Sequence, residues 1–222
     1  MLNLNYRSNQ TIVEASNEVI RKNKFIVDKD LQAFNKKASK LNIYAADEAG
    51  IDDVEYLVKR VKELAKKGLE SSEMLVLYRR SKMFEPYGRA LHREGLSVTA
   101  KTIHAAKGLE ARAVFIIGLL QGYGGFPDIW YNDAIYQVIR REKFHLMLEE
   151  ERRLFYAALT RAREEINLIT LRGSESQFID EIPLRYFTVP AVQAVSLAQC
   201  PGCGVQLQPG VNFCSHCGQK IA

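Results

Sequence analysis

The sequence predicts an α/β domain with a doubly wound, mostly parallel sheet, followed by a small cysteine-rich unit. Short apolar runs typical of buried strands alternate with stretches whose apolar residues recur at helical spacing. Glycines follow several of the helical stretches, where a left-handed residue commonly ends a helix. All four cysteines lie after Gln199, so the larger part of the chain has neither disulfides nor thiol chemistry.

Composition narrows the functional class only a little. A chain of 222 residues can form one sizeable core and a small appendage. Its net charge of +5 permits contact with nucleic acid but is a weak argument for it. No run reaches the roughly 18 apolar residues of a membrane span, and no signal-peptide pattern opens the sequence. We therefore expect a cytoplasmic protein without a membrane partner.

The first two thirds of the chain supply most of the expected elements. Ser8 or Asn9 caps a helix that runs to about Asn23, and the polar segment 22–40 is assigned to loop and short helix. Two further helices cover residues 52–67 and 83–93, closed by Gly68 and Gly95. The apolar runs assigned to strands are 41–46, 74–78, 97–103, 113–119 and 166–171.

A helix is expected over Glu149–Glu165, after another over 133–147. Its apolar stripe consists of Leu154, Phe155, Ala157, Ala158, Leu159 and Ala162. Arg161 projects into this stripe, where its guanidinium would lose water and gain no partner from the helix. Two interpretations stay open. Arg161 reaches an anion supplied from elsewhere, or it extends past the helix C-terminus, where a cation is also favoured.

Three segments resemble motifs of the UvrD/Rep-type superfamily 1 helicases. The segment E-E-E-R-R-L-F-Y-A-A-L-T-R-A-R, from Glu149, is similar to motif VI. Leu4–Ser8, L-N-Y-R-S, resembles motif IV, and Lys101–Glu110, K-T-I-H-A-A-K-G-L-E, resembles motif V. The matches occur in the family's order and cover residues 1–183, which implies the family's second RecA-like domain (a P-loop NTPase-type fold).

The resemblance implies an ATP site that this chain completes only in part. Tyr6 would stack on the nucleotide base, while Arg7 and Arg161 would bring positive charge to the γ-phosphate as catalytic arginine fingers. Glu110 would accept the ribose hydroxyl, and Gly108 would let the backbone approach the nucleotide. These five residues are the predicted contacts to ATP with Mg²⁺.

The resemblance also implies a track for single-stranded DNA. The residues assigned to it are Arg79, Arg80, Thr102, His104 and Lys107. Arg79 matches an arginine that contacts the DNA backbone. Two positions later Ser81 replaces the family's usual amide, so we expect Arg80 and Lys82 to compensate by charge. His104 could instead be a structural hydrogen-bond partner at a strand end.

Two features of the family are missing from this sequence. No G-x-x-x-x-G-K-[ST] phosphate loop occurs, so the first RecA-like domain and its Mg²⁺ carboxylates would have to come from upstream or from a separate chain. Asp47 and Glu48 follow an apolar strand but precede a helix, and we interpret them as N-terminal helix charges. The helical subdomain that the family usually inserts before motif V is also absent, because only a few residues separate Arg93 from Ser97.

The C-terminal residues 199–222 predict a zinc ribbon, joined to the large domain by a linker over 184–198. Cys200 and Cys203 form one C-x-x-C knuckle, and Cys214 and Cys217 form the second. Four thiolates at this spacing suit tetrahedral Zn²⁺, whereas disulfides are disfavoured in the cytoplasm. His216 is expected to be exposed rather than a ligand. The ribbon either docks on a protein partner or stacks a base through Phe213.

The leading hypothesis is the C-terminal motor half of an ATP-dependent DNA helicase or translocase, inactive without a phosphate-loop domain. The alternative is a non-enzymatic module, derived from such a domain, that binds nucleic acid or a partner. A scaffold would have no need of Arg7, Arg161 and Glu110, so their presence favours the motor.

Overall fold

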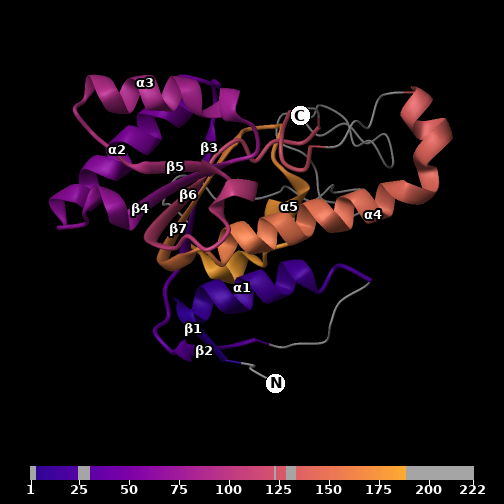
Figure 1. The fold of residues 1–222 in the computed structure, drawn as a ribbon, viewed down its shortest axis with the longest axis horizontal. Coiled ribbons are helices and arrows are strands. Elements are labelled where there is room, and N and C mark those ends of the chain that lie inside the picture. The colour runs from indigo at the N-terminus through magenta and orange to yellow at the C-terminus, as the bar shows by residue number, and fades with distance from the viewer. Residues whose placement is uncertain (1–3, 25–30, 123, 129–133, 189–222) are drawn as a thin grey trace, which may run out of the picture. The chain divides into compact units, whose positions relative to one another are not determined.

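A six-stranded parallel sheet lies between two layers of helices (Figure 1). The computed structural model describes residues 4–24, 31–122, 124–128 and 134–188. The strands lie in the order β5-β4-β6-β7-β3-β8, and each pair of neighbours is parallel. Their bounds are β3 Leu41–Ala46, β4 Met74–Tyr78, β5 Thr99–Thr102, β6 Ala111–Ile116, β7 Ala162–Leu171 and β8 Phe187–Thr188. The predicted doubly wound parallel sheet is therefore confirmed.

Helices cover both faces of this sheet because parallel strands need crossover connections. The helices α2 (Asp52–Lys66) and α3 (Glu85–Arg93) cover one face. On the other face lie α1 (Gln10–Ile20), α4 (Ala134–Leu159) and α5 (Gln177–Asp180). Side chains of the central strands β4 and β6 alternate between the two cores, as the strand period of two requires. These strands are consequently apolar on both sides, which is why they were recognisable as continuous apolar runs.

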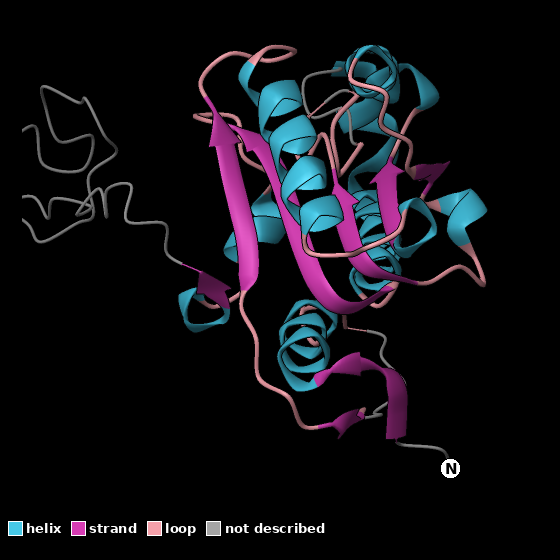
Figure 2. Ribbon diagram, turned by 90° about the vertical axis from the view of Figure 1, so that its left-hand side faces the viewer, coloured by secondary structure: helices cyan, strands magenta, loops and turns pink. Residues whose placement is uncertain are grey.

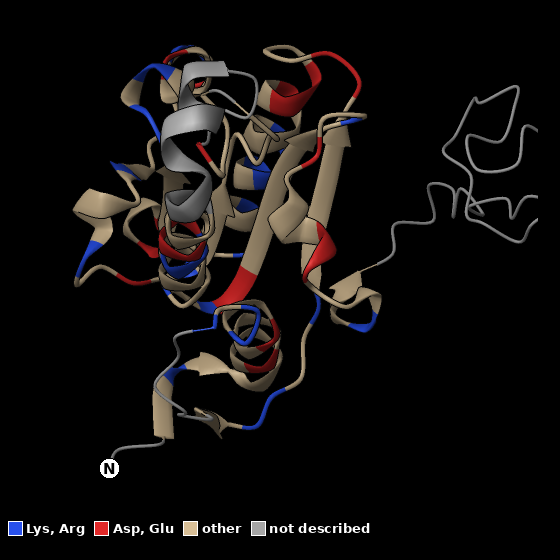
Figure 3. Ribbon diagram, turned by 90° about the vertical axis from the view of Figure 1, so that its right-hand side faces the viewer, with Lys and Arg blue, Asp and Glu red and all other residues tan. Residues whose placement is uncertain are grey.

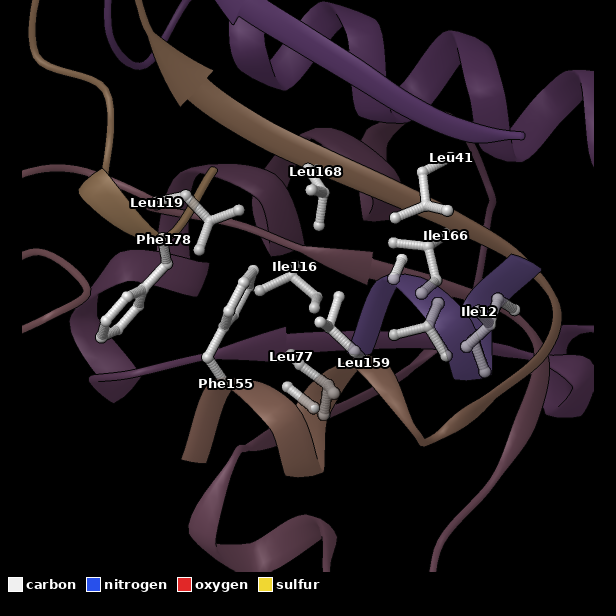
Figure 4. Packing of buried hydrophobic residues seen from close by; sticks show 14 of the residues in the cluster. Ile12, Leu41, Leu77, Ile116, Leu119, Phe155, Leu159, Ile166, Leu168 and Phe178 are labelled. Atoms are coloured by element: carbon white, nitrogen blue, oxygen red, sulfur yellow. The ribbon is translucent and has the colours of Figure 1, made fainter. Parts of the chain in front are cut away.

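The end of α4 is fixed by aromatic packing. Figure 4 shows Phe155 and Leu159 directed at sheet residues that include Ile116, and both side chains have no exposed surface. The ring of Phe155 stacks on Phe178 of α5 at 5.4 Å between centroids. The edge of Phe126 completes the cluster at 5.7 Å from each of these two rings. This burial holds the end of α4 in one position.

A separate two-stranded parallel sheet lies beside α1 (Figure 2). It pairs β1 (Leu4–Asn9) with β2 (Gln32–Asn35), and α1 is the crossover between them. The assignment of 22–40 to loop and short helix was therefore wrong at β2. This strand has one buried side chain, Ala33, so it lacks the apolar pattern that marks the others. Its pairing with β1 is a tertiary effect that local sequence does not reveal.

The helix predicted over Glu149–Glu165 ends earlier, at Leu159, and is continuous with the helix before it. Residues 162–165, assigned to that helix, instead begin β7. The Thr160 backbone nitrogen still donates to the carbonyl oxygen of Tyr156 at 3.0 Å. The Thr160 hydroxyl donates to the carbonyl oxygen of Ala157 at 3.1 Å, which a longer helix would have bonded through the backbone nitrogen of Arg161. Ala162 then pairs with Ala111 of β6 and is fully buried. Arg161 consequently lies in a turn between helix and strand.

Smaller differences concern element ends. The predicted strand 97–103 is confined to β5, and the predicted helix 83–93 divides into a 3₁₀ turn, Ser81–Phe84, followed by α3. Residues 184–188, assigned to the linker, form another 3₁₀ turn and β8, which pairs with β3. The chain divides after Thr188 into two units, and the second, Val189–Ala222, lies outside the described residues. Among the described helices, none is both long and apolar enough to cross a membrane.

Candidate functional site

Four charged residues from three segments meet where β6 and β7 begin, and we call them the arginine cluster. The members are Arg7, Glu110, Arg161 and Arg163. Arg7 donates from Nε to Glu110, and from a terminal nitrogen to the carbonyl oxygen of Thr160 at 3.3 Å. Arg163 approaches the other oxygen of Glu110 at 3.9 Å. Two cations thus contact one carboxylate, and Arg161 lies near enough for the charges of Arg7 and Glu110 to act on it.

Local hydrogen bonds explain how β1 brings Arg7 to this place. The side-chain oxygen of Asn5 accepts from the backbone nitrogens of Arg7 (2.8 Å) and Ser8 (2.9 Å), which bends the strand. Ser8 is fully buried and donates to the carbonyl oxygen of Ala162 at 2.7 Å. Asn9 caps α1 and also donates to the carbonyl of Glu164. The N-terminal motif is therefore attached directly to the first residues of β7.

Arg161 has no carboxylate partner among the described residues. Its Nε donates to the carbonyl oxygen of Ala157 at 2.9 Å, and a terminal nitrogen donates to that of Leu109 at 3.3 Å. Burial lowers the pKa of Arg161, the positive charge of Arg7 lowers it further, and Glu110 raises it. The guanidinium remains a cation because an arginine titrates far above neutral pH. Arg161 therefore shows features of both interpretations. It bonds a carbonyl oxygen at the end of α4, and its half-buried charge has no anion paired with it among the described residues.

A shallow pocket of about 480 Å³ opens beside the arginine cluster. The side chains around it are Leu4, Asn5, Tyr6, Arg7, Leu31, Glu110 and Arg163. The ring of Tyr6 is 65% exposed and lies 4.9 Å from that of Phe34, which is 62% exposed. An exposed pair of rings next to three cations offers both a stacking surface and an anion-binding surface.

The motif V segment runs between the two ends of the sheet. Gly108 has a φ of +86°, which favours glycine, although open space surrounds the position where a Cβ would lie. Glu110 immediately precedes β6 and faces Arg7. The predicted nucleotide residues Tyr6, Arg7 and Glu110 therefore line one pocket, and Arg161 lies next to it.

A second group gathers at the carboxyl ends of β4 and β5, and we call it the strand-end cluster. It consists of Arg79, Arg80, His104, Asp128 and Glu151. Arg79 donates from Nε (3.2 Å) and NH2 (2.8 Å) to the two oxygens of Glu151, and its NH1 lies 2.8 Å from His104 Nε2. Arg80 donates to Asp128 at 2.6 and 2.8 Å.

Thr102 and Lys107 lie at the border of this cluster. Thr102 ends β5, pairs with Tyr78 of β4, and accepts from the backbone nitrogen of Ala105 at 3.3 Å. Lys107 is exposed. On the side shown in Figure 3, acidic and basic residues are interspersed rather than segregated. Of the residues assigned to DNA, Arg79 and His104 are in contact, and Arg79 and Arg80 are each already paired with a carboxylate.

Sequence reasoning missed several residues of both clusters. Phe34 lies on the strand that was not predicted, and Arg163 lies in the part of the predicted helix that is strand β7 instead. Glu151 was not singled out within the motif VI segment, and Asp128 lies in a loop without a motif. No group of histidine, cysteine and acidic residues in the described part could hold a metal ion. The four cysteines lie outside the described residues.

Comparison with known proteins assigns the family. Residues 1–101 and 88–173 match the UvrD-like helicase C-terminal domain. A probable DNA helicase of Mycoplasma pneumoniae is 30% identical over 176 residues, covering 75% of this chain and 31% of that protein. DNA helicase IV of Escherichia coli is 29% identical over 179 residues, covering 81% of this chain and 25% of its own length.

Structural comparison supports the same fold. The C-terminal domain of a possible DNA helicase from Lactobacillus plantarum superimposes with a TM-score of 0.52 at 20% identity. The superposition covers 82% of this chain and 97% of the other. The chain thus spans a third or less of the helicases it matches, and nearly all of one solved C-terminal domain.

Proposed function

The chain belongs to the family of UvrD-like helicase C-terminal domains, and on that basis we propose that it is the C-terminal motor half of an ATP-dependent DNA helicase or translocase. The observation that carries the proposal is the arginine cluster. Arg7 and Arg161 come from opposite ends of the described sequence and converge beside Glu110. The two positive charges repel each other, and a multiply charged anion such as a triphosphate would offset this repulsion.

Residues in and beside the cluster have tasks that suit their chemistry. Tyr6 offers an exposed ring to the base, and the ring of Phe34 lies next to it. Arg7 and Arg161 direct positive charge at the transferring phosphoryl group. The Glu110 oxygen without the Arg7 bond has only the longer contact to Arg163, so it is the acceptor for a ribose hydroxyl. Gly108 has no side chain, and the free space beside it lets a nucleotide approach the backbone.

A phosphate-loop domain must supply the remainder of the ATP site. The chain lacks the loop sequence that would hold the β- and γ-phosphates and Mg²⁺. Hydrolysis would then require the two domains to close on one nucleotide, and the arginines would reach the phosphates only in that closed state.

The strand-end cluster is the proposed contact to single-stranded DNA. It lies at the carboxyl ends of parallel strands, where open α/β sheets bind ligands. Glu151 of α4 contacts Arg79, and Thr160, directly after α4, contacts Arg7. One helix therefore supports both clusters, which suits a motor whose DNA and ATP sites must act together.

Reconstitution tests the proposed function. We expect no ATP hydrolysis by the chain alone, because nothing in its sequence can cradle the β- and γ-phosphates. Addition of a matching phosphate-loop domain should produce hydrolysis that single-stranded DNA stimulates, measured as phosphate release. A reconstituted pair that binds ATP without hydrolysing it would favour the non-enzymatic module.

The C-terminal cysteines form the second part of the proposal. Cys200, Cys203, Cys214 and Cys217 have the spacing of a structural zinc site, and a unit of this size gains most of its folding energy from the metal. Within the ribbon, Lys220 is the one residue with a charged side chain, so a protein partner suits it better than a phosphate backbone.

Metal analysis of the purified chain tests the zinc site. We expect about one equivalent of zinc, since four thiolates complete one tetrahedral site. Cys214→Ser should release most of it, whereas His216→Ala, in the same knuckle, should leave the content unchanged. Wild-type protein with four free thiols and no metal would contradict the proposal.

A further inference from the structure

Glu151 holds Arg79 in a nearly buried ion pair. The Glu151 side chain is 10% exposed and that of Arg79 is 21% exposed. Both carboxylate oxygens accept from Arg79, and one also accepts from the backbone nitrogen of Asp128 at 3.2 Å. A paired geometry of this kind fixes the plane of the guanidinium as well as its position.

His104 is fixed by the same guanidinium. Arginine has only donors, so the nitrogen of His104 that lies 2.8 Å from Arg79 must accept. The ring proton of His104 is then on Nδ1, and that N–H is the donor left for a ligand. Glu151 therefore orients Arg79 directly and His104 through Arg79.

Two roles for Glu151 are conceivable, and energetics distinguishes them. In the first role, Glu151 would compete with a DNA phosphate for Arg79, so DNA binding would break the Arg79–Glu151 pair. Release would leave a nearly buried carboxylate unpaired, which costs more than one charge-assisted hydrogen bond to a phosphate returns. Arg79 instead stays on Glu151 and presents its outward N–H groups to the ligand. The energetics thus favour a role in which Glu151 keeps Arg79 in place while Arg79 binds DNA.

We propose that Glu151 is a positioning residue that holds Arg79 and His104 as a preformed contact for one phosphate of single-stranded DNA. The inference rests on the proposed function, since it deepens the assignment of the strand-end cluster to DNA. It predicts that an acidic residue promotes binding to a polyanion, the opposite of its simple electrostatic effect.

Glu151→Gln tests the role in the full-length chain, with oligo(dT) as the probe. Glutamine keeps the size of the side chain, but its amide can accept from only one of the two Arg79 donors. We expect affinity at low salt to fall about tenfold, the effect of losing one charge-assisted contact. The slope of log affinity against log salt should fall by about one, as for one lost phosphate contact.

Glu150→Gln is the matched control. It removes the same charge from the adjacent position of α4, where the side chain is 69% exposed and pairs with Arg153. Electrostatics alone predicts the same slight gain in affinity for both variants. We expect that gain for Glu150→Gln only. Equal affinities and slopes for the two variants would overturn the inference and leave the proposed function intact.

Arg79→Lys provides a test that does not alter Glu151. Lysine keeps the charge but cannot make the paired contact, so affinity should fall despite an unchanged net charge. Wild-type affinity in this variant would reject the positioning role. A wild-type chain that binds no oligo(dT) at low salt would overturn both this inference and the DNA contact that it deepens.

Discussion

Replacing Arg161 with alanine is expected to lower ATP turnover by the reconstituted motor on the order of 10³-fold, the contribution typical of an arginine finger. Arg161 is half-buried beside Arg7 and has no carboxylate among the described residues to compete with a phosphate. Its charge is therefore available for the transition state. Nucleotide affinity should change less, because the phosphate loop supplies most ground-state binding. Phosphate release at saturating DNA measures the effect.

Two further variants make this result specific. Arg161→Lys should restore little turnover, because an ammonium cannot bridge two phosphoryl oxygens as a guanidinium does. Arg89→Ala removes an exposed arginine from α3, on the opposite face of the sheet, and should leave turnover unchanged. Near-normal turnover with Arg161→Ala would reduce that residue to a cap on the carbonyl of Ala157 and favour the non-enzymatic module.

Sequence patterns identified the parallel sheet because burial on both faces makes the central strands β4 and β6 continuous apolar runs. β3 and β4 begin and end where the apolar runs predicted. β2 was missed because a strand of four residues with one buried side chain has no such pattern. The end of α4 was missed for a different reason. Helical spacing continues past Leu159 in the sequence, but pairing of Ala162 with β6 is a tertiary interaction that prevails over it.

In the candidate site, too, the residues within motifs could be predicted and those defined by tertiary contacts could not. The motif resemblance identified Tyr6, Arg7 and Glu110, which line one pocket, and the residues of β4 and β5 whose ends meet. It did not identify Glu151 and Asp128, the carboxylates that pair with Arg79 and Arg80. Helical spacing places Glu151 in line with Leu154 and Ala158, so its burial follows from the sequence, but only the approach of Arg79 gives it a role. Partners distant in sequence leave no local pattern.

Burial of the polar side of α4 is the clearest departure from helical periodicity. Arg152 lies outside the apolar stripe of the predicted helix, yet its side chain is 7% exposed. It donates from Nε and NH2 to the two oxygens of Glu181, both at 2.7 Å, and from NH1 to Asn23 at 2.6 Å. Because α1 and the segment after α5 cover this side, one arginine joins three parts of the fold.

Replacing Arg152 with alanine is therefore expected to lower the free energy of unfolding of the larger unit, Met1–Thr188, by about 3–5 kcal/mol. This is the usual effect of breaking a buried ion pair. The cost arises from Glu181, 15% exposed, and from Asn23, which both lose their donor. Chemical unfolding followed by far-ultraviolet circular dichroism measures the change. Arg89→Ala is the control, since Arg89 is 72% exposed, its partner Glu85 is 62% exposed, and such pairs contribute about 1 kcal/mol or less.

A double-mutant cycle separates the ion pair from lost packing. Arg152 also lies over the ring of Phe178, 5.6 Å from its centroid, and alanine removes that contact too. If the unpaired charge dominates, Arg152→Ala combined with Glu181→Ala should be much less destabilising than the sum of the two single changes, because no buried charge is left without a partner. Additive effects would assign the loss to packing. A loss below about 1 kcal/mol for Arg152→Ala, in the range of an exposed pair, would instead mean that solvent reaches this side of α4, as the sequence pattern alone suggests.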